Sequence, residues 1–250
     1  MVTADHDELL ERVLVDAKLT DSRLILEHLA RYIFATDLVK GGYRVLDCAS
    51  GAGYGAHILK NAGAEAVHGY DLDAEAVSWA KTHYKAEGLE FFEQNILTTS
   101  SDSEASYDLV TSFETIEHVP DPDKMIKALH SKLKPGGILC ISTPFKIPEN
   151  TAPDGKPYNI YHLFEWTFGE FRQILEKCFT EIEWFTQGLR PIKGSLPFSR
   201  SFRARAAASW YKQHKAKMPR GILDFEVRMF PADLSSLVEG KNMLAVCRKS

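Results

Sequence analysis

Short apolar runs alternate with helix-spaced apolar residues along most of the chain. From Tyr43 onward, runs rich in Val, Ile, Leu and Phe are separated by segments whose apolar residues recur every three or four positions. Alternation of this kind, with short loops, predicts a parallel β-sheet with helices on both faces. The expected strands are 43–48, 66–71, 90–94, 107–112, 137–143, 181–186 and 243–248, and the expected helices between them are 54–62, 73–86, 121–134 and 168–178.

Two further amphipathic helices are expected ahead of the first strand, at 7–17 and 21–36, and Thr20 or Asp21 can cap the second of them. We divide the chain into four parts. They are the N-terminal helices over the cofactor site (1–42), a cofactor-binding core (43–187), a basic and aromatic insertion (188–240) and a final strand of the core (241–250).

The most informative stretch is a glycine-rich turn between a strand and a helix. Residues 43–57 read YRVLDCASGAGYGAH, with glycines at 51, 53 and 55. Glycines suit a turn that bends sharply and lets the backbone approach a ligand. Twenty residues after Gly51, at the end of the next apolar run, stands Asp71, where an acid can accept hydrogen bonds from both ribose hydroxyls. The stretch predicts a nucleotide-binding unit.

Two kinds of ligand fit this unit. The spacing Gly51-x-Gly53-x-x-Ala56 also satisfies the dinucleotide fingerprint. Asp47 favours the other ligand, because a pyrophosphate at a helix N-terminus is poorly matched to a nearby carboxylate. A zwitterionic amino-acid tail carrying a sulfonium, as in S-adenosylmethionine, is well matched to it.

Four motifs together carry a resemblance to a known family. VLDCASGAGYGA, GYDLD, DLVTSFETIEHV and LKPGGILCISTP occur in this order, and over about 29–187 the chain resembles class I S-adenosylmethionine-dependent methyltransferases. HLARYIFA and YHLFEWTFGEF resemble a bacterial branch that accompanies sugar and polysaccharide biosynthesis. The resemblance implies an α/β, Rossmann-like fold with a seven-stranded, mostly parallel sheet, helices on both faces and an antiparallel last strand. It also implies S-adenosyl-L-methionine as the cofactor.

Ligands of open α/β sheets bind at the carboxyl ends of the strands. In the resembling family the helix at 21–36 covers the methionine end of the cofactor, which would bring Arg31 or Tyr32 near its carboxylate; packing of Tyr32 and solvation of Arg31 is the alternative. Asn95 stands where family members often carry Asp, and Leu72 and Ile96 are suited to enclose the adenine or are ordinary core. The expected cofactor-binding residues are Arg31, Tyr32, Asp47, Ala49, Gly51, Gly53, Tyr54, Asp71, Leu72, Asn95, Ile96 and Phe113.

The candidate catalytic groups follow the fourth strand, in SFETIEHVPDP. This stretch carries Glu114, Glu117 and His118. Histidine is well matched to proton removal near neutral pH, and in similar sugar O-methyltransferases a His before the Val-Pro-Asp turn is the base. We assign His118 as the general base, with Glu114 and His162 as further catalytic candidates, against the alternative that His118 only holds the loop.

A metal site is considered and not assigned. Glu114, His118, His162 and Glu165 could hold a divalent ion, but neither His-x-x-x-His nor Asp-x-Asp spacing occurs among them. Thr143 and Pro144 stand where some related enzymes carry an Asp, which puts a simple His–Asp dyad in doubt.

The insertion departs most from a minimal methyltransferase. Residues 188–223 contain nine Lys or Arg, one His and no acid. Phe198, Phe202, Ala206, Trp210 and His214 recur every four residues and predict a helix with an aromatic stripe. The segment is interpreted as a lid or a dimer contact; alternatively, 198–217 contacts a phosphate-bearing acceptor or an anionic membrane surface.

Composition narrows the possible partners. A net charge of −4 over 250 residues does not produce the positive electrostatic potential that attracts nucleic acid, so we expect no nucleic-acid partner. No stretch approaches the length of a membrane span and the first residues are acidic, so we expect a cytoplasmic protein. The four cysteines form no CxxC pair and are interpreted as buried, reduced thiols.

These observations lead to an O-methyltransferase that uses S-adenosylmethionine and acts on a hydroxyl of a sugar, glycoside or polysaccharide precursor. Methylation of a nitrogen or carboxylate on another small metabolite or natural product is the alternative reaction. A dinucleotide-dependent oxidoreductase and a catalytically silent cofactor-binding subunit are the remaining alternatives. A homodimer through the insertion is a further expectation.

Overall fold

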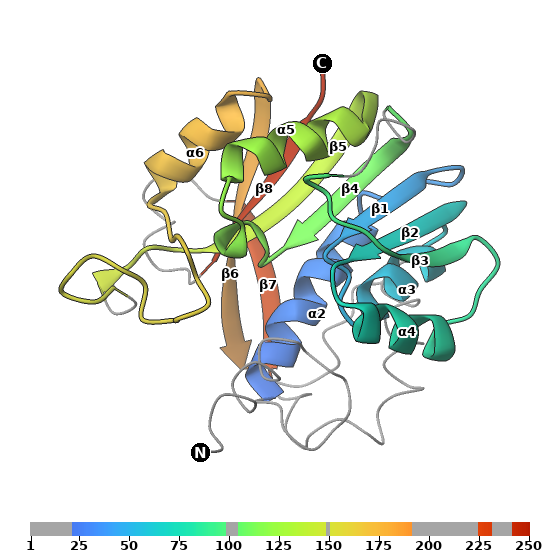
Figure 1. Ribbon diagram of the computed structural model, residues 1–250, viewed down its shortest axis with the longest axis horizontal. Helices are drawn as coiled ribbons and strands as arrows, with labels where there is room; N and C mark the ends of the chain where they lie inside the picture. The colour runs from blue at the N-terminus through green and yellow to red at the C-terminus, as the bar shows by residue number, and fades with distance from the viewer. Residues whose placement is uncertain (1–21, 99–104, 149–150, 192–224, 232–241) are drawn as a thin grey trace. The chain divides into compact units, whose positions relative to one another are not determined.

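The structure is a computed structural model that describes residues 22–98, 105–148, 151–191, 225–231 and 242–250 (Figure 1). The chain divides into two compact units, which are described separately. The first unit comprises Met1–Tyr43, Ala49–Gln94 and Leu189–Arg228, and the second comprises Arg44–Cys48, Asn95–Gly188 and Met229–Ser250.

The first unit contains two parallel strands and three described helices. These elements are α2 (Ser22–Thr36), α3 (Tyr54–Asn61), β2 (Ala66–Asp71), α4 (Ala74–His83) and β3 (Leu89–Glu93). Strands β2 and β3 pair in parallel over their whole length, from Val67 opposite Leu89 to Asp71 opposite Glu93. Helix α4 begins where the side chain of Asp73 accepts a hydrogen bond from the Glu75 N–H, which satisfies one of the unpaired donors of its first turn.

The second unit contains most of the sheet. Its elements are β1 (Arg44–Cys48), β4 (Tyr107–Phe113), the 3₁₀ helix η2 (Ile116–His118), α5 (Pro122–Lys132), β5 (Leu133–Pro144), α6 (Phe168–Glu176), β6 (Glu181–Pro191) and β8 (Asn242–Arg248). The strand order is β1-β4-β5-β8-β6. A further strand, β7, spans Phe225–Pro231. Strands β1, β4 and β5 run parallel, whereas β8 is antiparallel to both of its neighbours.

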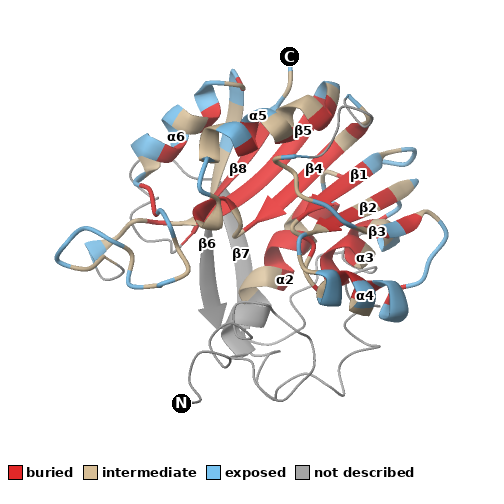
Figure 2. Ribbon diagram, viewed as in Figure 1, coloured by how far each residue is buried: buried red, intermediate tan, exposed pale blue. Residues whose placement is uncertain are grey.

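The hydrophobic core of this second unit lies on these strands. All but the last residue of β8 and all but one residue of β4 are buried (Figure 2). Helices α5 and α6 lie side by side over one face of the sheet (Figure 1). Helix α6 has a complete capping box, in which Thr167 and Glu170 bond each other's backbone N–H groups. The nearly continuous burial of β4 and β8 is the pattern expected of strands that are covered on both faces.

The expected fold class is confirmed: the sheet is mostly parallel, the last strand is antiparallel and helices accompany the strands. Three elements differ from the expectation. Strand β5 begins at Leu133, so Pro135, Gly136 and Gly137 lie inside it and shift its register against β4 between Tyr107 and Leu109. Strand β7 and helix η2 were not expected from the apolar pattern. The expected helix at 7–17 and the aromatic stripe of the insertion lie outside the described residues.

The cysteines agree with their interpretation as reduced thiols. All four are free, with Cys48, Cys140 and Cys247 buried and Cys178 half-buried. Burial raises the pKa of the Cys140 thiol and of the Cys247 thiol, which keeps both thiols protonated. Among the helices of the described residues, none has the length and apolar character required to cross a bilayer.

Candidate active site

The glycine-rich turn of the first unit adopts the conformation that its sequence requires. Gly51 and Gly53 have positive φ angles of 50° and 86°, and Gly53 is the N-cap of α3. A Cβ added at Gly53 would lie 2.6 Å from the Cβ of Ala80, whereas a Cβ at Gly51 would meet nothing within 4 Å. Gly53 is therefore required by packing against α4, while Gly51 faces open space where a ligand can approach. Ala49 also has a positive φ, 63°, a strained conformation for a residue with a side chain.

Asp71 fastens this turn to the end of β2. Its Oδ2 atom accepts a hydrogen bond of 2.7 Å from the Gly51 N–H, and its Oδ1 atom accepts one of 2.9 Å from the Asp73 N–H. The Ser50 N–H donates to the Tyr70 carbonyl oxygen at 2.9 Å. Asp71 is half-buried, so its carboxylate holds the turn and is also accessible to a ligand hydroxyl.

Tyr32 and Arg31 are both buried on α2, at 5% and 1% relative exposure. The Tyr32 ring lies directly on Gly55, where an added Cβ would come within 2.0 Å of its Cζ atom. Its centroid is 5.5 Å from that of Tyr54, and the two rings are edge-on. The packing alternative for Tyr32 thus has direct structural support, and a contact of either α2 side chain with the cofactor stays a prediction.

The adenine-binding candidate of the first unit, Leu72, is 68% exposed at the end of β2. An exposed leucine beside a ligand site is consistent with contact to a flat apolar ring, and ordinary core packing is excluded for it. Tyr54, the first residue of α3, is buried.

The cofactor-binding candidates of the second unit stand at strand ends. Asp47 is fully buried in β1 and its Oδ1 atom accepts a 2.7 Å hydrogen bond from the Thr111 hydroxyl. Phe113 is buried at the end of β4. Asn95 and Ile96 are half-buried, and the side-chain oxygen of Asn95 accepts a 2.9 Å hydrogen bond from the Leu97 N–H.

Glu114 follows β4 in a strained conformation, with a φ of 49°. Its Oε1 atom accepts a 2.6 Å hydrogen bond from the Ser142 hydroxyl, and its Oε2 atom accepts one from the Asn242 amide. Strands β5 and β8 therefore both hold this carboxylate. The arrangement gives Glu114 a fixed position beside the predicted catalytic histidine segment.

A cluster of three side chains, Glu117, His118 and His162, forms in the second unit. Their potential metal-ligating atoms all lie within 4.8 Å of one another, and the two histidine rings are edge-on with centroids 4.9 Å apart. The Nδ1 atom of His118 is 2.9 Å from the Tyr161 carbonyl oxygen. Because a carbonyl can only accept, that Nδ1 carries the hydrogen, and the neutral ring has its lone pair on Nε2.

Two residues outside the expected catalytic set hold this cluster in place, Glu165 through His162 and Thr143 through Glu117. The Nδ1 atom of His162 is 2.8 Å from Oε1 of Glu165, a buried carboxylate. Buried Glu117 accepts a 3.0 Å hydrogen bond from the Thr143 hydroxyl. The doubted His–Asp dyad is thus replaced by a His–Glu pair, and the His-x-x-Glu spacing at 162–165 was the signal that could have indicated it.

Backbone hydrogen bonds join the two segments that carry the histidines. The carbonyl oxygen of Glu117 accepts the N–H groups of Leu163 at 2.8 Å and of Phe164 at 3.3 Å. Together with the His118–Tyr161 bond, these contacts fasten the loop 158–164 to helix η2. The structure therefore brings His118 and His162 together, although they are 44 positions apart in the chain.

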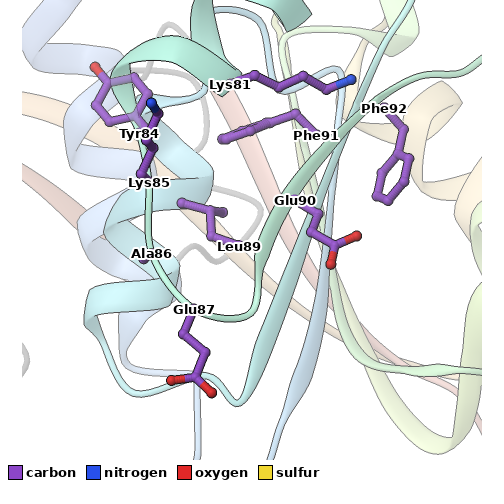
Figure 3. A pocket seen from close by; sticks show the side chains of 9 residues that line it. All are labelled: Lys81, Tyr84, Lys85, Ala86, Glu87, Leu89, Glu90, Phe91 and Phe92. Atoms are coloured by element: carbon purple, nitrogen blue, oxygen red, sulfur yellow. The ribbon is translucent and has the colours of Figure 1, made fainter.

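An open groove of about 670 Å³ lies elsewhere in the first unit, between the end of α4 and β3 (Figure 3). Its lining includes the cations Lys81 and Lys85, the anions Glu87 and Glu90, and the ring of Tyr84. None of the predicted site residues lines it. The mixed charges give it no clear ligand preference.

Comparison with known proteins decides the family. A family model described as a methyltransferase domain matches residues 18–181 of the chain. The chain belongs to this methyltransferase family. Membership of this family favours S-adenosyl-L-methionine over a dinucleotide as the ligand of the glycine turn. The turn fits this cofactor, because Gly51 is open to a ligand and Asp71 presents a half-buried carboxylate next to it.

Sequence relatives of the methyltransferase carry two kinds of name. A protein of Mycolicibacterium smegmatis named "Probable S-adenosylmethionine-dependent methyltransferase" is 29% identical over 69% of this chain and 68% of its own length. A "Ubiquinone biosynthesis O-methyltransferase" of Xanthomonas euvesicatoria is 37% identical over 46% of this chain. The matched region covers only 48% of that relative's length.

Solved structures share the fold of the methyltransferase. The YcgJ protein of Bacillus subtilis has a TM-score of 0.58 and 15% identity over 88% of this chain and 97% of its own. An S-adenosylmethionine-dependent methyltransferase from Mesorhizobium loti has a TM-score of 0.55 and 17% identity over 88% and 98% of the two chains. At this level of identity the likeness establishes the fold.

Proposed function

We propose that this methyltransferase transfers the methyl group of S-adenosylmethionine to a phenolic hydroxyl of an apolar small molecule. The observation that carries the proposal is a pair of oriented histidines, His118 on η2 and His162 in the loop 158–164, together with the large exposed side chains of that loop. The histidines can activate a hydroxyl group, and the apolar side chains can contact an aromatic ring of the acceptor.

The loop 158–164 presents an apolar surface beside His162. Tyr158, Ile160, Leu163 and Phe164 are 61%, 82%, 51% and 39% exposed. Four large exposed side chains within seven residues are more than the single exposed apolar residues that are normal on a protein surface, and such concentrations commonly mark a binding site. A sugar presents hydroxyls on most of its surface and matches such a loop poorly, whereas an aromatic ring matches it well.

Proton removal also favours a phenol. Methyl transfer requires an oxygen lone pair, and a phenol, whose pKa is about 10, gives its proton to a neutral imidazole far more readily than an alcohol, whose pKa is close to the value of about 15.7 for water. The Nδ1 atom of His118 donates to the Tyr161 carbonyl oxygen, and the Nδ1 atom of His162 donates to the Glu165 carboxylate. These hydrogen bonds fix the orientation of both rings and leave the lone pair of each ring on Nε2. The cluster is therefore well suited to activate an acidic hydroxyl.

Relatives support oxygen as the methylated atom. The Xanthomonas euvesicatoria relative is named for O-methylation in ubiquinone biosynthesis. The sugar or polysaccharide acceptor expected from the sequence has no such support from the names of these relatives. Methylation of a nitrogen or carboxylate stays an alternative prediction, because it would not strictly require a base.

The acceptor class is tested with labelled S-adenosylmethionine and matched acceptors. Simple catechols, including alkyl-substituted ones, are compared with nucleotide-activated sugars and methyl glycosides, and products are identified by mass spectrometry. We expect methyl ethers of the catechols, with higher kcat/KM for the alkylated compounds. If only the sugars are methylated, the proposal of a phenolic acceptor is wrong, and the sugar acceptor expected from the sequence is supported instead.

The role of the histidine pair is tested by substitution. His118→Ala should lower turnover by about 10²-fold or more, the usual contribution of a proton-transfer group, while affinity for S-adenosylhomocysteine stays nearly unchanged. His162→Ala is the companion variant. Full activity of both variants would show that neither histidine activates the hydroxyl.

A further inference from the structure

We infer that strand β3 pairs edge to edge with β3 of a second copy of this chain, so that the methyltransferase forms a symmetric dimer. Among the described strands, β3 is paired with β2 along one edge and with no strand along the other. An unpaired strand edge presents main-chain N–H and C=O groups that another strand can bond. The inference concerns a surface of the first unit and is independent of the acceptor proposed above.

Alternate residues supply the outer edge of β3. The Val67 N–H of β2 donates to the Gly88 carbonyl oxygen at 2.7 Å, and at the other end of the strand the Gln94 N–H donates to β2 at 2.8 Å. Because the bonding direction alternates from one residue to the next along a strand, the even-numbered residues of β3 face β2. The N–H and C=O groups of Phe91 and Glu93 therefore face outward.

The register of the pairing follows from symmetry. Two copies of one strand pair in antiparallel about a two-fold axis, and a residue next to the axis exchanges N–H and C=O bonds with its own copy. Phe91, at the centre of β3, meets this requirement, whereas the main-chain groups of Glu90 and Phe92 face β2. With Phe91 at the axis, Glu93 lies opposite Leu89 of the second copy. An axis at Glu93 would instead set two glutamates directly opposite each other, which is destabilising.

Helix α4 covers the face of β3 that carries Phe91. A Cβ added at Gly53 would lie 2.6 Å from the Cβ of Ala80 in α4 and 2.8 Å from Cε1 of Phe91, so helix and ring meet at this glycine. The open groove of about 670 Å³ lies between the end of this helix and β3, and the exposed cations Lys81 and Lys85 line it (Figure 3). Two positive charges therefore lie on this side of the outer edge.

Pairing about Phe91 brings acids to these two cations. Side chains alternate between the faces of a strand, so Glu93 shares the face of Phe91 that α4 covers. Since Glu93 of the second copy lies opposite Leu89, its exposed carboxylate comes to the groove that the two lysines line. The two-fold axis repeats this contact. The groove and the strand end are thus complementary in charge to their own copies, which favours a second copy as the partner.

The expected interface is small. Strand β3 has five residues, and the N–H of Leu89 already donates to the Ala86 carbonyl oxygen at 3.1 Å. Phe91 and Glu93 of each copy can donate across the axis. Short interfaces of this kind lie at the weak end of specific association. We therefore expect a reversible dimer with a Kd in the micromolar range or weaker.

Dimerisation is measured by sedimentation equilibrium of the full chain, from micromolar to near-millimolar protein. We expect a monomer–dimer equilibrium that weakens as salt rises, because exposed charge contacts are screened. Glu93→Lys should weaken the dimer about 10-fold or more, since it brings like charges together twice. Adding Lys81→Glu and Lys85→Glu to that variant should restore the dimer. The control Glu75→Lys makes the same charge change in the first turn of α4 and should have no effect.

A cross-link tests the register. Opposite residues of antiparallel strands that exchange no hydrogen bonds have Cα atoms about 4.5 Å apart, a distance that a disulfide spans. Glu90→Cys combined with Phe92→Cys should therefore give covalent dimers on mild oxidation. Glu90→Cys alone should not, because the two copies of that residue lie on a diagonal, roughly 7 to 8 Å apart. The wild type, in which three of the four cysteines are buried, gives the background.

Thermal denaturation shows that each variant is folded. A dimer that Glu93→Lys weakens, that the lysine reversals restore and that the paired cysteines trap supports the inference. A wild type that stays monomeric at every concentration would overturn it. A dimer that Glu93→Lys leaves unweakened would place the contact on another surface and overturn it as well. Cross-linking of the paired cysteines no greater than that of Glu90→Cys alone would also reject the edge pairing.

Discussion

Asp71 offers the sharpest test of the cofactor site, because its carboxylate has two separable roles. In the structure it accepts backbone N–H groups from Gly51 and Asp73, at 2.7 and 2.9 Å. If it also accepts the ribose hydroxyls of S-adenosylmethionine, Asp71→Ala removes two interactions that stabilise the fold and further ones that stabilise the complex. Stability and affinity therefore respond to the same substitution by different amounts.

The stability loss follows from the two backbone contacts. Hydrogen bonds to a charged group contribute roughly 1.5 to 3 kcal/mol each when buried, and less where water can replace them. Asp71 is half-buried, so we expect a total loss of about 2 kcal/mol in the free energy of unfolding. For a chain of this size that corresponds to a decrease in Tm of about 4 to 8 °C. Urea denaturation and a thermal scan measure both quantities.

The affinity loss follows from the ribose contacts. A loss of about 1.5 to 3 kcal/mol weakens S-adenosylhomocysteine binding by about tenfold or more, measured by calorimetry at a temperature where the variant is folded. Asp71→Asn keeps one acceptor oxygen, so its affinity for S-adenosylhomocysteine should lie between that of the wild type and that of Asp71→Ala. Glu75→Gln removes a neighbouring exposed charge and should change stability by less than about 0.5 kcal/mol. Lower stability with unchanged affinity in Asp71→Ala would show that Asp71 only fastens the turn and that the ribose lies elsewhere.

Three further predictions concern packing, capping and thiols. Gly55→Ala should destabilise the fold by about 1 to 3 kcal/mol in urea denaturation, because its Cβ would collide with the Tyr32 ring; the control Gly169→Ala, a helical position with open space, should not. Thr167→Ala should cost about 1 kcal/mol at neutral pH. Hydrogen bonds that the Glu170 carboxylate accepts from the Thr167 N–H and hydroxyl lower the pKa of Glu170 below its ordinary 4.5, so their contribution is full above that value and is lost as pH falls through the lowered pKa, whereas the bond from the Glu170 N–H to the Thr167 hydroxyl does not depend on pH; a difference between Thr167→Ala and the wild type that does not shrink in acid would contradict it. Titration with a thiol reagent should modify only Cys178 in the native protein, and slowly, since burial raises its pKa; rapid reaction of several thiols would contradict the burial.

The fold could be predicted because its signals are local. Each strand and helix of the core is a run of a few residues, and the glycine turn and Asp71 are 20 positions apart on consecutive elements. Errors occurred where tertiary context decides. The Pro135–Gly137 segment reads as a turn, yet pairing with β4 includes it in β5. Strand β7 depends on a neighbour, β6, that lies far away in the sequence.

The candidate active site could be predicted only in part, for the same reason. His118 and His162 were recognised from their residue type and neighbouring motifs. Their meeting depends on hydrogen bonds between Glu117 and the backbone of the loop that contains Leu163, which no local pattern reports. The role of Glu165 depends on the direction of the His162 ring.

The attachment of the 158–164 loop has a consequence for how such enzymes diversify. The loop is fastened to η2 by main-chain atoms of Glu117, Tyr161, Leu163 and Phe164, apart from the single His118 side chain. Its exposed apolar side chains take no part in that attachment. If the loop contacts the acceptor as proposed, mutations at Tyr158, Ile160 and Leu163 can change which molecule is recognised while the position of His162 is kept. An enzyme with this loop can therefore evolve to accept new molecules through mutations at the exposed loop surface. Each evolutionary intermediate keeps the arrangement of the two histidines.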